Sequence, residues 1–206
     1  VGGQFTTAGG IPVVARIARW NPITEEWEAL GIDGTGATLQ GINCMAFDAN
    51  GDLYIGGSFS NLGSTDGDGI VKLSNLSGTP TVSNLGTGLD GIPLAIAIAT
   101  NGDVFVGGYF TSAGGVANTS HIAKWDGTSW SALATGLNAE VRSLAFAPNG
   151  DLYIGGGFTN ADGTYGDYLC YWDGASFNRV GTVELGAAGS VYSLAFDATG
   201  RLYVGG

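Results

Sequence analysis

The chain repeats itself along its whole length. The tripeptide Val/Ile-Gly-Gly begins at positions 1, 55, 106, 154 and 204, at spacings of 54, 51, 48 and 50 residues. The match extends beyond the tripeptide, since Gln4–Gly10 aligns with Tyr109–Gly115 and with Gly157–Gly163. A sequence pattern that repeats at a nearly constant spacing predicts that each copy folds into the same supersecondary unit. Each unit then buries its apolar face against the neighbouring copies.

Each repeat carries four strand signals. The first strand is predicted at Ile42–Phe47, Leu94–Ile98, Val141–Phe146 and Val191–Phe196, and the second at Leu53–Gly57 and its copies. The third is predicted at Arg16–Trp20, Gly69–Leu73, His121–Trp125 and Tyr168–Trp172, and the fourth contains Trp27, Val82, Trp130 or Phe177. Four short strands per repeat of about 50 residues are typical of a β-propeller blade. No segment has helical periodicity, which excludes a helical solenoid.

The first strand of each repeat has one small face and one large face. Small residues alternate with bulky ones, as in Ser143 and Ala145 against Leu144 and Phe146. Successive side chains of a strand point to opposite faces, so the large face of one blade is predicted to fill the space beside the small face of its neighbour. Cys44 occupies a small-face position, so we interpret it as a packing residue.

Composition and turns agree with an all-β chain. There are 38 glycines, and only 12% of the residues are charged. Asn-Gly after the first strand and Asp-Gly after the third supply the positive φ that tight hairpins require. The Gly-Gly pair of the second strand removes side chains where another backbone or a bulky ring must approach closely.

Charge and sparse chemistry exclude several classes of partner. The net charge is −11, and the seven Lys and Arg residues form no cluster, so a nucleic-acid backbone is not an expected partner. No apolar run reaches the length of about 20 residues that crosses a bilayer. His121 is the only histidine, and no Ser or Cys triad is visible, so no metal, cofactor or nucleophilic site is predicted.

The repeat resembles a known family. Ile55-Gly56-Gly57, together with the segment from Ile17 to Trp27, is similar to the kelch repeat, in which a Gly-Gly pair is followed by two spaced aromatic residues. The second repeat departs most from that pattern, with Leu73 and Val82 at the aromatic positions. The turn and second strand also look like propeller repeats of bacterial surface proteins and phage structural proteins. The resemblance covers the whole chain and implies a propeller, but propellers host many activities.

We therefore predict an all-β chain of four consecutive four-stranded antiparallel blades, with repeats at residues 1–54, 55–105, 106–153 and 154–206. The four blades are expected to form an arc of a larger ring, completed by further blades of the same chain or by homo-oligomerisation. A closed four-bladed ring and an open array of blades remain alternatives.

Two groups of residues are candidates for binding. Propeller loops carry binding while strands carry packing, and the loop between second and third strands varies most. This points to Asp66, Asp68, Tyr165 and Asp167, although a solvated acidic loop is the better explanation of these residues. The tryptophans Trp20, Trp125 and Trp172 form a possible glycan platform, and packing between blades is the competing interpretation.

The function expected from these features is a non-catalytic scaffold that binds protein or glycan through its loops. The composition favours an extracellular, cell-surface or virion location. The alternatives are a lectin with repeated carbohydrate sites between blades and, third, a polysaccharide hydrolase or lyase. A carboxylate pair that meets at the ring mouth from distant blades would serve the last of these.

Overall fold

The computed structural model describes residues 1–13, 15–32, 34, 37–63, 68–161, 164–165, 168–181 and 189–206, and all regular structure in these ranges is β-strand. Three sheets have four strands each. They are β5 (Thr38–Phe47), β6 (Leu53–Ser60), β7 (Ile70–Ser74) and β8 (Thr81–Asn84); β9 (Ile92–Ile98), β10 (Val104–Tyr109), β11 (Ile122–Trp125) and β12 (Trp130–Ala132); and β13 (Val141–Phe146), β14 (Leu152–Gly156), β17 (Leu169–Trp172) and β18 (Phe177–Arg179). We call them the first, second and third sheets. Each is an antiparallel meander in chain order.

Two half-sheets lie at the ends of this series. One pairs β3 (Ala18–Asn21) with β4 (Glu26–Ala29), and the other pairs β19 (Ser193–Phe196) with β20 (Leu202–Gly205). Two small hairpins lie in the loops. One pairs β1 (Thr7–Ala8) with β2 (Ile11–Pro12), and the other pairs β15 (Asn160–Ala161) with β16 (Thr164–Tyr165). The sheets are therefore offset from the repeat boundaries. The first strand of each complete sheet lies at the end of one repeat, the second strand spans the boundary, and the third and fourth strands lie in the next repeat.

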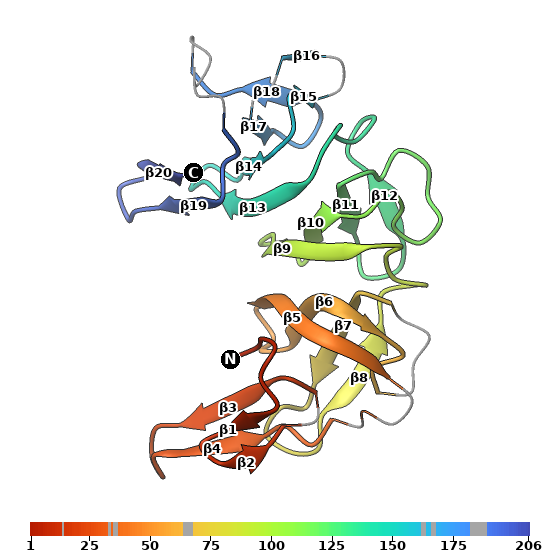
Figure 1. Cartoon of the computed structure of the whole chain (residues 1–206). Helices are drawn as coiled ribbons and strands as arrows, with labels where there is room; N and C mark the ends of the chain where they lie inside the picture. The colour runs from red at the N-terminus through yellow and green to blue at the C-terminus, as the bar shows by residue number, and fades with distance from the viewer. Residues whose placement is uncertain are drawn as a thin grey trace.

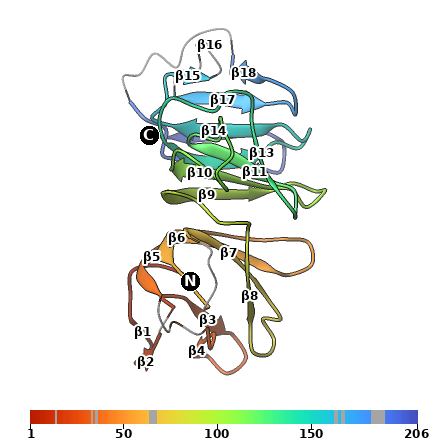
Figure 2. The ribbon, with the colours of Figure 1, turned by 90° about the vertical axis from the view of Figure 1, so that its right-hand side faces the viewer.

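The sheets fan out around an open space (Figure 1). β5, β9 and β13 lie on the concave side of the arc, and the fourth strands β8, β12 and β18 lie on the outside. Turned by 90°, the second and third sheets are seen stacked face to face (Figure 2). This radial arrangement of four-stranded antiparallel sheets is a β-propeller, which confirms the predicted fold class.

The sheets nest as their alternating first strands predict. Ala97, on the small face of β9, lies in the core between the second and third sheets, and Leu144 and Phe146 of β13 pack against that core. On the opposite face of β9, Ile96 and Ile98 pack against the core shared with the first sheet. The ring of Phe146 meets that of Phe105 edge to face at 5.6 Å. Bulky residues of one sheet thus fill the space that its neighbour leaves empty.

The two glycines of the Gly-Gly pair each allow a different close contact. A Cβ on the first glycine would collide with the next sheet, as at Gly107, which faces Val141. A Cβ on the second glycine would overlap a carbonyl of the first strand within the same sheet, as at Gly108, which faces the Ile92 oxygen. The second contact coincides with a register shift between β9 and β10. The predicted close approach at these glycines is confirmed, and it occurs on both sides of the strand.

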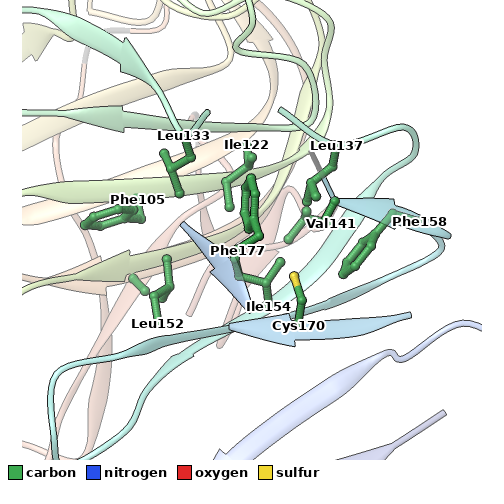
Figure 3. Close-up of a cluster of buried hydrophobic side chains, with 12 residues drawn as sticks. Phe105, Ile122, Leu133, Leu137, Val141, Leu152, Ile154, Phe158, Cys170 and Phe177 are labelled. Atoms are coloured by element: carbon green, nitrogen blue, oxygen red, sulfur yellow. The ribbon is translucent and has the colours of Figure 1, made fainter. Parts of the chain in front are cut away.

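One core illustrates the packing (Figure 3). Phe105, Val141, Ile154 and Phe158 converge with Cys170 between the second and third sheets, and Ile154 and Phe158 are fully buried. Cys170 and Cys44 are free thiols, as expected for packing residues. Burial raises the pKa of each of the two thiols to about 12, so neither is a reactive thiolate at neutral pH.

Within the described residues, no helix has the length and apolar character needed to pass through a bilayer.

Replacing Gly156 by Ala should lower the free energy of unfolding by about 3 kcal/mol, because the new Cβ would overlap the carbonyl oxygen of Glu140 and force the backbone apart. Gly189→Ala is the matched control, since its Cβ would meet nothing within 4 Å. Denaturant unfolding of both variants measures the difference. Equal stability of the two variants would contradict this account of the glycine pair.

Candidate functional site

A pocket of about 310 Å³ opens between the first and second sheets. Its polar lining comes from both sheets and from the loop before β7. The lining residues used below are Gln40, Ser58, Ser60, Asp68, Asp90 and Ile92. We call this the Asp68 pocket.

Asp68 is held by its backbone and leaves its side chain exposed. Its carbonyl oxygen accepts a hydrogen bond from the amide of Leu89 at 2.9 Å. The next residue, Gly69, has a φ of +73° and exchanges hydrogen bonds with β6 through Gly57 and Phe59. With the residues that the structure describes, the Asp68 carboxylate makes no hydrogen bond or ion pair. Asp68 therefore lines the pocket with an exposed carboxylate that has no partner among the described residues.

The residue just beyond the Gly-Gly pair differs from one sheet to the next. Counting from the Gly-Gly pair, Ser58 of β6 corresponds to Tyr109 of β10 and to Gly157. Where the second sheet carries Tyr109, the phenol oxygen accepts a hydrogen bond from Arg142 of the third sheet at 2.6 Å. Among the described residues, the small Ser58 side chain makes no such contact with the second sheet; its hydroxyl group donates to Gln40 of its own sheet at 3.5 Å, and the Asp68 pocket lies beside it.

The bridge in the second gap is a cluster of aromatic and charged groups. The Arg142 guanidinium lies 5.6 Å from the ring centre of Tyr109 and 4.8 Å from that of Tyr192. It also forms an ion pair with Glu140 at 2.9 Å. Because these groups satisfy one another, the place beside Tyr109 that corresponds to the Asp68 pocket is occupied by side chains.

Asp90, the second carboxylate of the pocket, has a structural role. It accepts hydrogen bonds from the amides of Thr111 and Ser112, both at 2.8 Å, and from the Thr111 hydroxyl. Burial acts to raise the pKa of Asp90, but the hydrogen bonds from Thr111 and Ser112 together outweigh it and hold the pKa below its usual value. Asn138 makes the same cap at Thr159 in the next unit. Asp90 therefore shapes the pocket wall, and Asp68 is the carboxylate available to a ligand.

The chemistry of the pocket suits a ligand rich in hydroxyl groups. Asp68 is a pure acceptor, Gln40 both donates and accepts, and the hydroxyl groups of Ser58 and Ser60 do either. Ile92, which is partly exposed, adds an apolar surface. Few polar groups converging beside an apolar surface are the usual composition of a small-molecule site.

The loop residues predicted from sequence fare differently. Asp68 lies in the pocket. Asp66 and Asp167 lie outside the described residues, and Tyr165 ends β16, of which the structure describes only the backbone. Gln40, Ser58 and Ser60 were missed by the sequence analysis. The available signal was the change from Ser58 to Tyr109 at one repeat position, which becomes informative once the two sheets are known to face each other.

The three predicted tryptophans do not form equivalent platforms. Trp125 is only 8% exposed and packs on Trp130, whereas Trp20 is 45% exposed and packs on Trp27. Trp172, partly buried against Phe177, borders a second pocket of about 520 Å³ between the second and third sheets. Their role as a glycan platform stays a prediction, and their unequal exposure does not favour a repeated site.

Across the part of the chain that the structure describes, no three His, Cys, Asp or Glu side chains gather as a metal centre would require.

Comparison with known proteins identifies the fold of this chain but does not identify a family. No protein-family model matches the chain, and no curated protein matches it. Among solved structures, it is similar to a gluconolactonase from Xanthomonas campestris, with a TM-score of 0.59 and 17% identity over 94% of this chain and 63% of that one. A putative gluconolactonase has a TM-score of 0.56 and 18% identity over 93% of this chain and 64% of that one. The extracellular domain of a putative one-component system from B. thetaiotaomicron has a TM-score of 0.55 and 12% identity over 88% and 22%.

These likenesses show a β-propeller and nothing finer. The chain spans less than two thirds of the length of each of these proteins. The identities are too low to carry an activity across, and kelch-type repeats are not specifically indicated.

The expectation that this chain is not an enzyme is wrong. It was drawn from the absence of a visible catalytic motif and from the view that such repeats build or bind. Proteins identified as gluconolactonases, which are enzymes, share the arrangement of sheets over most of this chain. A repeated packing pattern says little about catalysis, because the sites of a propeller form where sheets meet and are not contained in one motif.

Replacing Asp90 by Asn should make stability less dependent on acid pH. A carboxylate with a lowered folded pKa stabilises the fold above its unfolded pKa of about 3.9, and this contribution is lost as the pH falls through the folded value. The amide should keep the cap, as Asn138 does. Unfolding measured from neutral pH to about pH 2 should show a shallower loss for the variant than for the unmodified chain, which also contains other low-pKa carboxylates. Parallel pH profiles would show that the Asp90 carboxylate is not stabilised by the cap.

Proposed function

We propose that this chain is part of a β-propeller that binds a polyhydroxylated ligand, a carbohydrate or a close relative, in the Asp68 pocket. The observation that carries the proposal is an aspartate that lines a pocket, is fixed through its backbone and has an exposed carboxylate without a partner among the described residues. A carboxylate with a free acceptor site can take hydrogen bonds from two vicinal hydroxyl groups. Such charge-assisted bonds are about twice as strong as neutral ones.

The rest of the pocket supports the same ligand class. Gln40, Ser58 and Ser60 can bond further hydroxyl groups, and Ile92 can pack against the apolar C–H face of a sugar ring. A volume of about 310 Å³ is close to the lower end of ligand pockets and suits one sugar unit. The acidic lining and the net charge of −11 disfavour phosphorylated or sulfated ligands.

This proposal refines the expectation of binding through blade loops. Tyr109 and Arg142 occupy the corresponding place between the second and third sheets, so the Asp68 pocket has no copy there, which supports one specific site more than a lectin with a copy between every pair of blades. We further propose a kelch-like ancestry for the repeat and an extracellular, cell-surface or virion location. The low lysine content and the abundance of Gly, Thr and Asn support that location.

Catalysis on the same ligand is the second candidate. Asp68 shares the pocket with hydroxyl and amide groups. Its carboxylate would act as a general base that activates a water molecule to attack an ester or lactone. Hydrolysis of a sugar lactone is the reaction to examine first, since the solved neighbours include proteins named gluconolactonases. The base would take a proton from water as the acyl–oxygen bond is cleaved, giving a carboxylic acid and a hydroxyl group.

The test is a panel of neutral monosaccharides, oligosaccharides and sugar lactones, with binding followed by calorimetry and acid release followed by pH-stat. Asp68→Asn should weaken binding of any hit at least about 10-fold, because a charge-assisted hydrogen bond contributes about 1.5–3 kcal/mol. Ser58→Tyr should block the pocket by introducing the side chain found at Tyr109.

Glu25→Gln, which changes the charge equally at an exposed turn between β3 and β4, is the matched control and should bind normally. Binding without turnover would favour the ligand-binding function, and turnover lost in Asp68→Asn would favour the enzyme. Binding that survives both pocket variants would reject the site, as would the absence of any hit.

A further inference from the structure

A second pocket, of about 520 Å³, lies between the second and third sheets, and the proposed function does not use it. The hairpin turns that follow β9 and β17 border it, and both sheets have all four strands. The lining residues used below are Ala99, Asn101, Asp103, Phe105, Lys124, Phe146 and Trp172. We call this the Lys124 pocket.

One wall of the pocket belongs to the second sheet and carries its charged groups. Directly opposed residues of paired strands share one face of a sheet. Phe105 is opposed to Ala97 on one side and to Lys124 on the other, and Lys124 is opposed in turn to Ser131. Ala97 and Phe105 belong to the core shared with the third sheet. Lys124 and Ser131 therefore extend this row on the face that meets the third sheet.

The opposite wall belongs to the third sheet and is apolar. Phe146 is opposed to Leu152, and Leu152 is opposed to Trp172. Trp172 is opposed in turn to Phe177 and packs on its ring with ring centres 4.9 Å apart, yet it stays partly exposed. Phe105 and Leu152, both buried, lie near each other at one side of the core (Figure 3). The pocket thus combines ionic groups on one wall with an aromatic surface on the other.

The equivalent lysine of the first sheet has several partners. Lys72 is opposed to Tyr54 as Lys124 is to Phe105. Its ammonium lies 2.7 Å from Asp52 Oδ2 and 3.8 Å from Asp48 Oδ2, and 5.6 Å from the ring centre of Tyr54. Two carboxylates and a ring therefore satisfy this ammonium within its own sheet.

Lys124 has fewer partners because one residue of the repeat differs. Counting back from the Gly-Gly pair, Ala99 stands where the first sheet has Asp48. Lys124 is left with Asp103, whose Oδ2 lies 3.3 Å from the ammonium and also accepts a hydrogen bond from Asn101 at 3.1 Å. An ammonium has three N–H donors. Among the described residues, two of these donors and the Oδ1 atom of Asp103 have no partner.

Asp173, the other carboxylate of the pocket, is occupied by its own turn. It accepts hydrogen bonds from the amides of Ala175 and Ser176, from the Ser176 hydroxyl and from Asn178. These hydrogen bonds, the one from the Ser176 amide above all, lower the pKa of Asp173 to about 2. Asp103 is therefore the carboxylate of this pocket with an oxygen to spare.

Spare N–H donors beside a spare carboxylate oxygen suit a ligand that carries both charges. The ligand's carboxylate would accept from Lys124, and its ammonium would donate to Asp103. An anion without the ammonium would lie beside the Asp103 carboxylate in a chain of net charge −11, which disfavours it. An apolar group on the same ligand would pack on Trp172 and Phe146. An α-amino acid with a large apolar side chain has all three features.

We propose that the Lys124 pocket binds a free amino acid with a large apolar side chain, through ion pairs with Lys124 and Asp103 and packing on Trp172. A volume of about 520 Å³ lies within the usual range of small-molecule pockets. The site lies between a different pair of sheets from the Asp68 pocket and takes a different class of ligand. It does not depend on the proposed function, and either holds without the other.

Calorimetric titration with five small probes tests the ligand class. Phenylalanine and leucine should bind saturably. Glycine, which has no apolar side chain to bury, should bind at least about 10-fold more weakly. 3-Phenylpropanoate lacks the ammonium group, and phenylalaninamide has a neutral amide in place of the carboxylate. Each should bind at least about 10-fold more weakly than phenylalanine, because one charge-assisted hydrogen bond is lost.

Two variants and a matched control test the place of binding. Lys124→Met should weaken phenylalanine binding at least about 10-fold. Ala99→Asp should weaken it as well, because the new carboxylate would take the spare donors of Lys124 as Asp48 does for Lys72. Asp48 and Asp197 stand at this repeat position, so the variant should fold, which circular dichroism checks. Lys72→Met, the same change at the equivalent position of the first sheet, should bind normally.

Phenylalanine binding that is weakened in Lys124→Met and Ala99→Asp and kept in Lys72→Met supports the proposal. The absence of saturable binding by both phenylalanine and leucine overturns it. Binding of 3-phenylpropanoate as tight as that of phenylalanine overturns the ligand class, because the ammonium is then not recognised. Unchanged binding in Lys124→Met overturns the site, because the ligand then lies elsewhere.

Discussion

The fit of a large strand face against a small one is the interaction on which the rest of this structure depends. At each first strand, residues such as Leu144 and Phe146 project toward a preceding sheet whose own first strand presents alanine, as at Ala97. The first glycine of each pair removes the side chain where the neighbouring sheet is closest, as Gly107 does beside Val141. Because both devices are repeated, every sheet takes the same position relative to the last, and the units fan around a common axis.

The proposed binding site lies beside a position at which the repeats differ. The strands tolerate little change, since each face packs against a neighbour, but the positions just beyond the Gly-Gly pair point into the gap between sheets. A serine at position 58 leaves space there, whereas Tyr109 in the next unit reaches Arg142 and bridges the gap. Asp90 shows that a carboxylate in such a place can be purely structural, because a cap occupies its acceptor sites. In Asp68 the backbone is hydrogen-bonded, and the carboxylate has no partner among the described residues.

Much of the fold was predictable because its signals are local. Hairpin turns, alternation within β9 and β13 and the Gly-Gly pair all lie within one repeat, and they correctly indicated four-stranded antiparallel sheets. The candidate site was predictable only in part. Asp68 was found through the variability of its loop, but Gln40 and Ser60 carry no signal of their own, since they join Asp68 only after two sheets have met. The tryptophan platform stays a prediction, and the sequence could not show that Trp20 and Trp125, which share a repeat position, differ widely in exposure.

The sequence by itself determined the unit, its four strands, the alternation of faces and the place of each glycine, because these depend on neighbours within a few residues or on a fixed period. Only the tertiary structure decided where pockets open between the sheets and which carboxylate is capped. Those properties depend on pairs of residues about fifty positions apart, such as Tyr109 with Arg142 or Phe105 with Phe146, whose contact is set by how whole sheets pack.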